Sequence, residues 1–228
     1  PNYDAPETPR LTIKDGAGYA VIVVGKLDAY GEGQPEHTKT ADFVYRAFRD
    51  RGFAHEDICY LAEGAAQPYP DIFVDDTTPS EADTQAAITM WALSKMNTAP
   101  APLYVVFLDH GSEDKFYVYS GAYDGTRVIT PEELNAWFEV LQANLNLDAQ
   151  GQPIVLVYGA CHSGSFIDTL SAPNRIVITS SASDEVSHRG VREFGNALDV
   201  RDGEPFVTEL FRNARAGKTL KDAFEIAA

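Results

Sequence analysis

A cysteine and a histidine in this 228-residue sequence have the surroundings that covalent catalysis at a carbonyl group requires. His110 follows the apolar run 103–108 and precedes Gly111, whereas Cys161 follows the apolar run 154–158 and a glycine. A thiol must lose its proton before it attacks a carbonyl carbon, and an imidazole can take that proton and later protonate the leaving amine. The backbone N–H groups of Gly111 and Cys161 are natural donors to the oxyanion, each contributing roughly 3 kcal/mol when well aimed. We therefore predict Cys161 as the nucleophile and His110 as its acid–base partner.

The residues next to this pair have simpler expected roles. Cys161 precedes Ser-Gly-Ser and is expected to face the start of a helix, whose positive end favours a thiolate. Asp109 is expected to point away from the site and to be structural. Cys59 lies in a short apolar run and is expected to be a small core residue. For His162 three placements stay open: lining the cleft, tuning the thiolate, or lying on the surface.

The hydrophobic pattern predicts the elements that must position these side chains. Strands are expected at 19–25, 58–61, 103–108, 154–158 and 175–179, with a hairpin at 116–119 and 127–129. Helices are expected from about residue 40 to 52 after a Gly-rich loop at 26–38, at 83–95, after the cap Thr130, at about 206–214 and from 220 onward. Strands separated by helices imply a mostly parallel sheet covered on both faces, with its site at the carboxyl ends of the strands.

Composition limits the classes of partner. The sequence has 34 acidic and 18 basic residues, a formal net charge of −16, which repels nucleic acid phosphates and anionic lipid. No apolar run approaches the roughly 18 residues that cross a bilayer, and no signal peptide is recognisable. Two cysteines form no zinc motif, so we expect no cofactor and no metal. Calcium at the Asp-rich stretches 71–76 and 199–202 remains a weaker alternative, because neither has EF-hand spacing.

Two sequence blocks resemble those of legumain-type cysteine peptidases. The blocks are Val-Phe-Leu-Asp-His-Gly-Ser at 106–112 and Val-Tyr-Gly-Ala-Cys-His-Ser-Gly-Ser-Phe at 157–166. Cys161 lies 51 residues after His110, and roughly 50 residues separate the corresponding pair in caspases. The resemblance implies a caspase-like α/β fold: a three-layer sandwich of about six mostly parallel strands with a small appended hairpin. It also implies a Cys–His dyad without an obligatory third acid, and cleavage after one selected P1 residue.

The resemblance further implies one caspase-like peptidase domain over 1–228, with an extended N-terminal segment at 1–17 and a C-terminal helix cut off by the chain end. We expect a monomer that acts on peptide or protein substrates and can process itself.

The specificity pocket departs from the family pattern. Legumain has an acidic residue two positions before its nucleophile, where this sequence has Gly159. Other substrate-binding candidates that the resemblance implies are Lys39 or His37, Ser180, Ser181 and Glu193. An Asn or basic P1 residue is slightly favoured. Arg189 and Arg192 would instead suit an acidic P1 side chain.

Three other chemistries fit the sequence less well. Gly159-Ala-Cys161 is similar to the nucleophile turn of thiol α/β-hydrolases, which would require His188 as the base. A tyrosine phosphatase needs an Arg where this sequence has Ile167, and Gly31-Glu-Gly33 completes no phosphate-binding loop. A catalytically silent binding module on the caspase-like scaffold is the alternative of a different class.

Overall fold

The computed structural model describes residues 17–27, 31, 33–62, 70–118, 127–190 and 201–228. The expected extended segment at 1–17 lies outside the described residues apart from Ala17. Within the described part of the chain, no helix is long and apolar enough to cross a membrane.

A parallel five-stranded sheet forms the centre of the molecule. Its strands are β1 (Tyr19–Val24), β2 (Ile58–Ala62), β3 (Leu103–Leu108), β7 (Ile154–Gly159) and β8 (Arg175–Thr179), in the order β2-β1-β3-β7-β8. Each strand coincides with a predicted apolar run to within one residue. The described residues therefore give one strand fewer than the expected six in this sheet, while the predicted α/β class is confirmed.

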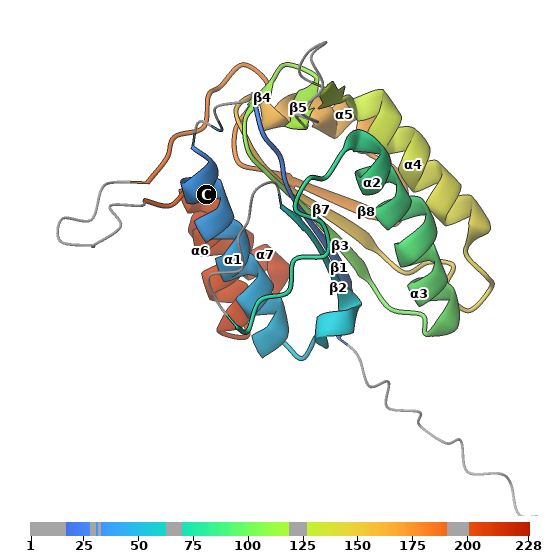
Figure 1. The fold of residues 1–228 in the computed structure, drawn as a ribbon. Coiled ribbons are helices and arrows are strands. Elements are labelled where there is room, and N and C mark those ends of the chain that lie inside the picture. Colours follow the sequence, from blue (N-terminus) through green and yellow to red (C-terminus); the bar gives the residue numbers. More distant parts are fainter. Residues whose placement is uncertain (1–16, 28–30, 32, 63–69, 119–126, 191–200) are drawn as a thin grey trace, which may run out of the picture.

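The two faces of the sheet pack against different helices because side chains alternate along each strand. Val21, Val23, Val105 and Phe107 face a core shared with the π-helical turn η2 (Ala87–Ala92), α3 (Leu93–Thr98) and α4 (Pro131–Asn144). The short helix α2 (Glu81–Ala86) leads directly into η2. Their alternating neighbours face α1 (Gln34–Asp50), α6 (Pro205–Arg215) and α7 (Leu220–Ala227). Figure 1 shows these two helical layers on either side of the strands. The molecule is thus the predicted three-layer sandwich.

A second, antiparallel sheet lies at the carboxyl end of the first. It consists of β4 (Gly111–Ser112), β5 (Lys115–Val118) and β6 (Arg127–Ile129), in that order. Phe116 pairs with Ile129, which confirms the predicted hairpin, although its connection at 119–126 lies outside the described residues. Figure 1 places β4 and β5 beside α5 (Ile167–Leu170) at this end of the molecule.

Local sequence signals explain most helix boundaries. Thr130 caps α4 through a complete capping box with Glu133, as predicted. The predicted start of α1 near residue 40 is wrong, because the helix begins at Gln34. Gly33 adopts a left-handed φ of 72° just before it, and Pro35 in the first turn fixes a helical φ. The helix predicted over 83–95 extends over α2, η2 and α3.

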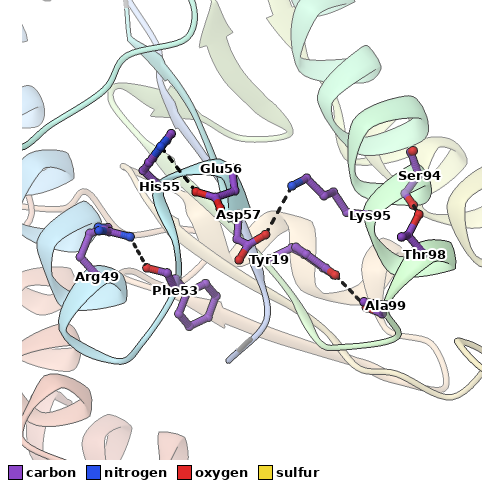
Figure 2. Close-up of polar contacts among 10 residues, drawn as sticks. All are labelled: Tyr19, Arg49, Phe53, His55, Glu56, Asp57, Ser94, Lys95, Thr98 and Ala99. Carbon is purple, nitrogen blue, oxygen red and sulfur yellow. Dashed lines mark hydrogen bonds and ion pairs between the residues drawn. The ribbon is translucent and has the colours of Figure 1, made fainter. Parts of the chain in front are cut away.

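Polar contacts link the elements at the opposite end of the sheet, where its strands begin, as Figure 2 shows. The Tyr19 hydroxyl donates to the carbonyl of Ala99 at 2.8 Å, and Lys95 lies 3.4 Å from Asp57 of the single turn η1 (His55–Asp57). These bonds tie β1 and η1 to α3. They hold the scaffold together at the end away from His110 and Cys161.

Candidate active site

His110 and Cys161 come from neighbouring strands at the same edge of the sheet. β3 and β7 are hydrogen-bonded partners in a parallel register that sets Leu108 opposite Gly159. The N–H of Asp109 donates to the carbonyl of Gly159 at 3.3 Å, which extends the pairing past the end of β3. Each candidate follows its last paired residue by two positions, so the sheet brings both to one level.

A cluster of hydroxyls fixes the turn that carries Cys161. The Ser181 hydroxyl donates to the carbonyl of Ala160 at 2.9 Å and accepts from the N–H of Ser163 at 3.2 Å. The Ser180 hydroxyl accepts from the N–H of Ala160 at 3.1 Å. Ser163 and Ser181 are both buried. The Ser-rich stretch after β8 therefore holds the turn between β7 and the short 3₁₀ turn η3 (Ser163–Phe166).

Gly111 lies directly against this turn. A Cβ atom there would come within 2.6 Å of the Cys161 carbonyl oxygen and 2.8 Å of the Tyr158 hydroxyl, so no side chain fits. Tyr117 N–H donates to the His110 carbonyl, which makes the next pair, Gly111 with Phe116, the non-hydrogen-bonded one. The Gly111 N–H consequently points away from β5. In the turn between β4 and β5, the Asp114 N–H donates to the Ser165 hydroxyl of η3 at 2.9 Å, which ties these strands to the segment that follows Cys161.

His110 lies beside a second, buried histidine. The rings of His37 and His110 are 5.3 Å apart and pack edge to face. Burial, with smaller contributions from His110 and Arg189, lowers the pKa of His37 to about 3, so its imidazole is neutral. Burial likewise raises the pKa of Asp109 well above its usual value. Asp109 was expected to point away from the site, but a carboxylate oxygen lies within 4.8 Å of a ring nitrogen of His110. Its side chain is only 2% exposed.

His37, Asp109 and His110 form the group within the described residues that could hold a metal ion. Their ligand atoms lie within 4.8 Å of one another, and a set of two imidazoles and a carboxylate suits zinc. Arg189, however, has a guanidinium nitrogen 3.5 Å from His110 Nε2. A permanent positive charge so near one ligand opposes binding of a cation, and we assign no metal to this group.

The Cys161 thiol faces the loop 185–189. Its Sγ lies 3.8 Å from the carbonyl oxygen and 3.9 Å from the hydroxyl of Ser187. Residue 162 has a left-handed φ of 58°, and its ring nitrogen Nδ1 bonds the carbonyl of Ser183. The His162 side chain is thereby held against the 181–185 segment. After Cys161 the chain continues into η3 and then into the four residues of α5, where the start of a helix was expected.

A pocket of about 550 Å³ adjoins the thiol, since Ser187 lines it. Lys39 and Ser180, two of the predicted substrate-binding residues, also line it, and Lys39 forms a 2.9 Å ion pair with Asp202. His188 and Arg189 line the same pocket. Ser181 has its hydroxyl engaged in the nucleophile turn, as described above. Glu193 and Arg192 lie outside the described residues.

Glu204 lines the same pocket, a role that was not predicted for it from the sequence. Its side chain fills the space beside Gly159, where a Cβ would come 2.9 Å from Glu204 Cγ. Burial raises the pKa of the Glu204 carboxyl to about 7, opposed by hydrogen bonds from Ser187 and Ser180. The sequence feature that could have indicated this role is the Glu-Pro pair at the start of α6, which sets an acidic residue at a helix N-terminus near the carboxyl edge of the sheet.

This topology, with a histidine and a cysteine after adjacent parallel strands, defines a caspase-like α/β protein. The solved structure of caspase-1 from Spodoptera frugiperda is similar, with a TM-score of 0.61 and 15% identity over 93% of this chain and 75% of that one. At that identity the likeness shows the fold alone. No curated protein matches the sequence.

The sequence profile of the Peptidase C13 family matches residues 93–228, which include His110 and Cys161. The chain belongs to the Peptidase C13 family, and it is a cysteine-type peptidase of the legumain-like kind whose substrates are peptides or proteins. The caspase-like fold overturns the α/β-hydrolase alternative. His188 follows β8, the other strand that pairs with β7, and it lines the pocket beside the thiol.

Proposed function

We propose that this chain is a cysteine endopeptidase in which Cys161 is the nucleophile and His110 the acid–base residue. The observation that carries the proposal is the pairing of β3 with β7, whose parallel register holds the two side chains at one edge of the sheet. In this mechanism the thiol proton passes to His110, and the thiolate attacks the substrate carbonyl to form a thioester. His110 then protonates the leaving amine, and water hydrolyses the thioester.

The oxyanion would accept hydrogen bonds from the N–H groups of Gly111 and Cys161. The orientation of Gly111 N–H away from β5, and the contact of Gly111 with the nucleophile turn, support this role. The N–H of His162 cannot take part, since it already donates to the carbonyl of Glu185 at 2.8 Å. The dyad needs no third acid in this scheme.

We propose the 550 Å³ pocket as the P1 pocket, with Lys39 and Ser180 in its wall and Gly159, Ser181 and Glu193 as further candidates. Two kinds of charged group line this pocket: cations such as Arg201, and the carboxyl groups of Asp202 and Glu204. A P1 carboxamide offers an acceptor to the former and donors to the latter, which favours Asn. A basic P1 side chain is the second choice, because it pairs with the carboxyl groups alone.

A P1-randomised fluorogenic peptide library tests activity and specificity together. We expect cleavage by the wild type after Asn or a basic residue, and loss of cleavage in both Cys161→Ala and His110→Ala. Cys59→Ala is the matched control, because burial raises the pKa of the Cys59 thiol to about 12 and removes it from chemistry. Cleavage that survives His110→Ala would refute the dyad.

Labelling distinguishes the enzyme from a silent binding module. An acyloxymethyl ketone peptide should form a single adduct on Cys161, identified by peptide mass spectrometry, and a protein without that adduct would be the silent module.

Incubation of wild type and Cys161→Ala followed by N-terminal sequencing tests self-processing. Addition of an amine nucleophile during turnover tests ligation, which would appear as a new amide product.

A further inference from the structure

Glu204 is a buried carboxyl group that the proposed dyad does not use. It occupies the N-cap position of α6, yet its side chain makes no capping hydrogen bond to that helix. Instead Oε1 accepts a hydrogen bond from the Ser187 hydroxyl at 2.6 Å, and the Ser180 hydroxyl also bonds the carboxyl. The residue is only 2% exposed. A carboxyl group held in this way, rather than at the helix terminus, is positioned toward the site.

Three elements fix this position. The Thr40 hydroxyl of α1 accepts from the N–H groups of Gly203 and Glu204, at 3.1 and 3.4 Å. Gly159 of β7 leaves the space that the side chain fills, as the 2.9 Å approach of a Cβ to Glu204 Cγ indicates. Pro205 starts α6 directly afterwards. Glu204 therefore has little freedom to turn to solvent.

The two serines connect the carboxyl group to the nucleophile. Ser187 Oγ lies 3.9 Å from Cys161 Sγ, within the range of a hydrogen bond to sulfur. Ser180 Oγ accepts from the N–H of Ala160, the residue before the nucleophile. One carboxyl group thus holds one hydroxyl that contacts the thiol and another that contacts the backbone next to it.

We propose that Glu204 is a positioning residue that determines, through the Ser187 hydroxyl, the direction of the hydrogen bond at the Cys161 sulfur. A serine hydroxyl has a single proton. When Glu204 is ionised, Ser187 gives this proton to the carboxylate, and only its lone pairs face the sulfur, whose own S–H donates to the Ser187 carbonyl. When Glu204 is neutral, the carboxyl group can donate to Ser187, whose own proton is then available to a thiolate.

The proposal rests on Cys161 being the nucleophile, and it makes the reactivity of the thiol depend on pH in a defined direction. Burial raises the pKa of Glu204 to about 7. As the pH rises through this value, the carboxyl group ionises and withdraws the Ser187 proton from the sulfur. Several other charged or titratable groups surround it: Lys39 of α1, Tyr158 of β7, Asp109, Arg189, Arg201, Asp202 and the neighbouring Glu185 and His188.

The rate of alkylation of Cys161 by iodoacetamide between pH 5 and 9, followed by peptide mass spectrometry on the full chain, tests this. In the wild type the logarithm of the rate should rise less steeply above pH 7. In Glu204→Gln the uncharged amide leaves the Ser187 proton available, so this shoulder should vanish and the rate at pH 8.5 should be about tenfold higher. Glu209→Gln, on the exposed side of α6, should behave as wild type.

Ser187→Ala provides the second arm. It should also abolish the shoulder, and Glu204→Gln should then have no effect in the Ser187→Ala background. The proposal would be overturned if the pH profile of folded Glu204→Gln superimposed on that of the wild type. It would also be overturned if the shoulder persisted in Ser187→Ala. This second result decides the matter if Glu204→Gln does not fold. Because alkylation needs no substrate, a chain that cleaves no peptide yet shows these profiles would contradict the proposed function and not this inference.

Discussion

The Gly159→Ala substitution tests the claim that α6 and Glu204 occupy the space in front of β7. An added Cβ would come 2.8 Å from Val207 Cγ2, 2.9 Å from Glu204 Cγ and 2.9 Å from Leu108 Cδ2. Carbon atoms in good contact lie about 3.5–4.0 Å apart, so three neighbours must each move by more than 0.5 Å or so. Overpacking of this kind costs roughly 1–3 kcal/mol. For a chain of this length we expect the melting temperature to fall by about 3–10 °C.

The measurement is thermal and urea unfolding, followed by circular dichroism, of Gly159→Ala and of the double variant Gly159→Ala/Val207→Ala. Val207→Ala alone should also destabilise, because it leaves a cavity. In the double variant the new methyl group uses that cavity, so the two costs should fall short of additivity by at least about 0.5 kcal/mol. A Gly159→Ala protein that melts within 1 °C or so of the wild type, or strict additivity in the cycle, would refute the packing described for this edge of the sheet.

Three further predictions concern the nucleophile turn, a helix cap and pH. Ser181→Ala removes the hydroxyl that bonds Ala160 and Ser163. It should lower the free energy of unfolding, measured in urea, by roughly 1–3 kcal/mol and slow the alkylation of Cys161. Substitution of the exposed Ser171 by Ala should have neither effect. Thr130→Ala breaks the capping box of α4 and should cost about 1 kcal/mol, with unchanged alkylation as the check that the site is intact. His37 takes up a proton below about pH 6.5 when unfolded but only near pH 3 when folded, so stability should fall with acidification by up to about 1.4 kcal/mol per pH unit across that range. His37→Gln should flatten this slope in unfolding titrations and exposed His55→Gln should not; equal slopes in all three proteins would contradict the buried, neutral His37.

Local sequence patterns were enough to predict the sheet, the cap of α4 and the two dyad candidates. Short continuous apolar runs bounded by turn residues, such as 103–108 and 154–158, are typical of strands buried on both faces, and parallel strands send their carboxyl ends to one edge. That is why the sequence predicts that His110 and Cys161 lie at the same edge of the sheet. The capping box at Thr130 was equally readable, because its partners are three residues apart.

The surroundings of the proposed dyad could not be predicted from local sequence patterns. Glu204 meets Ser187 across 17 residues and Gly159 across 45, and Arg189 reaches His110 across 79, so no local pattern encodes these contacts. The start of α1 at Gln34 was also missed, since Gly33 and Pro35 are as compatible with a loop as with a helix N-terminus. The physical reason is the same in each case: local propensity and periodicity report neighbours along the chain, whereas a pocket is made by side chains that only packing brings together.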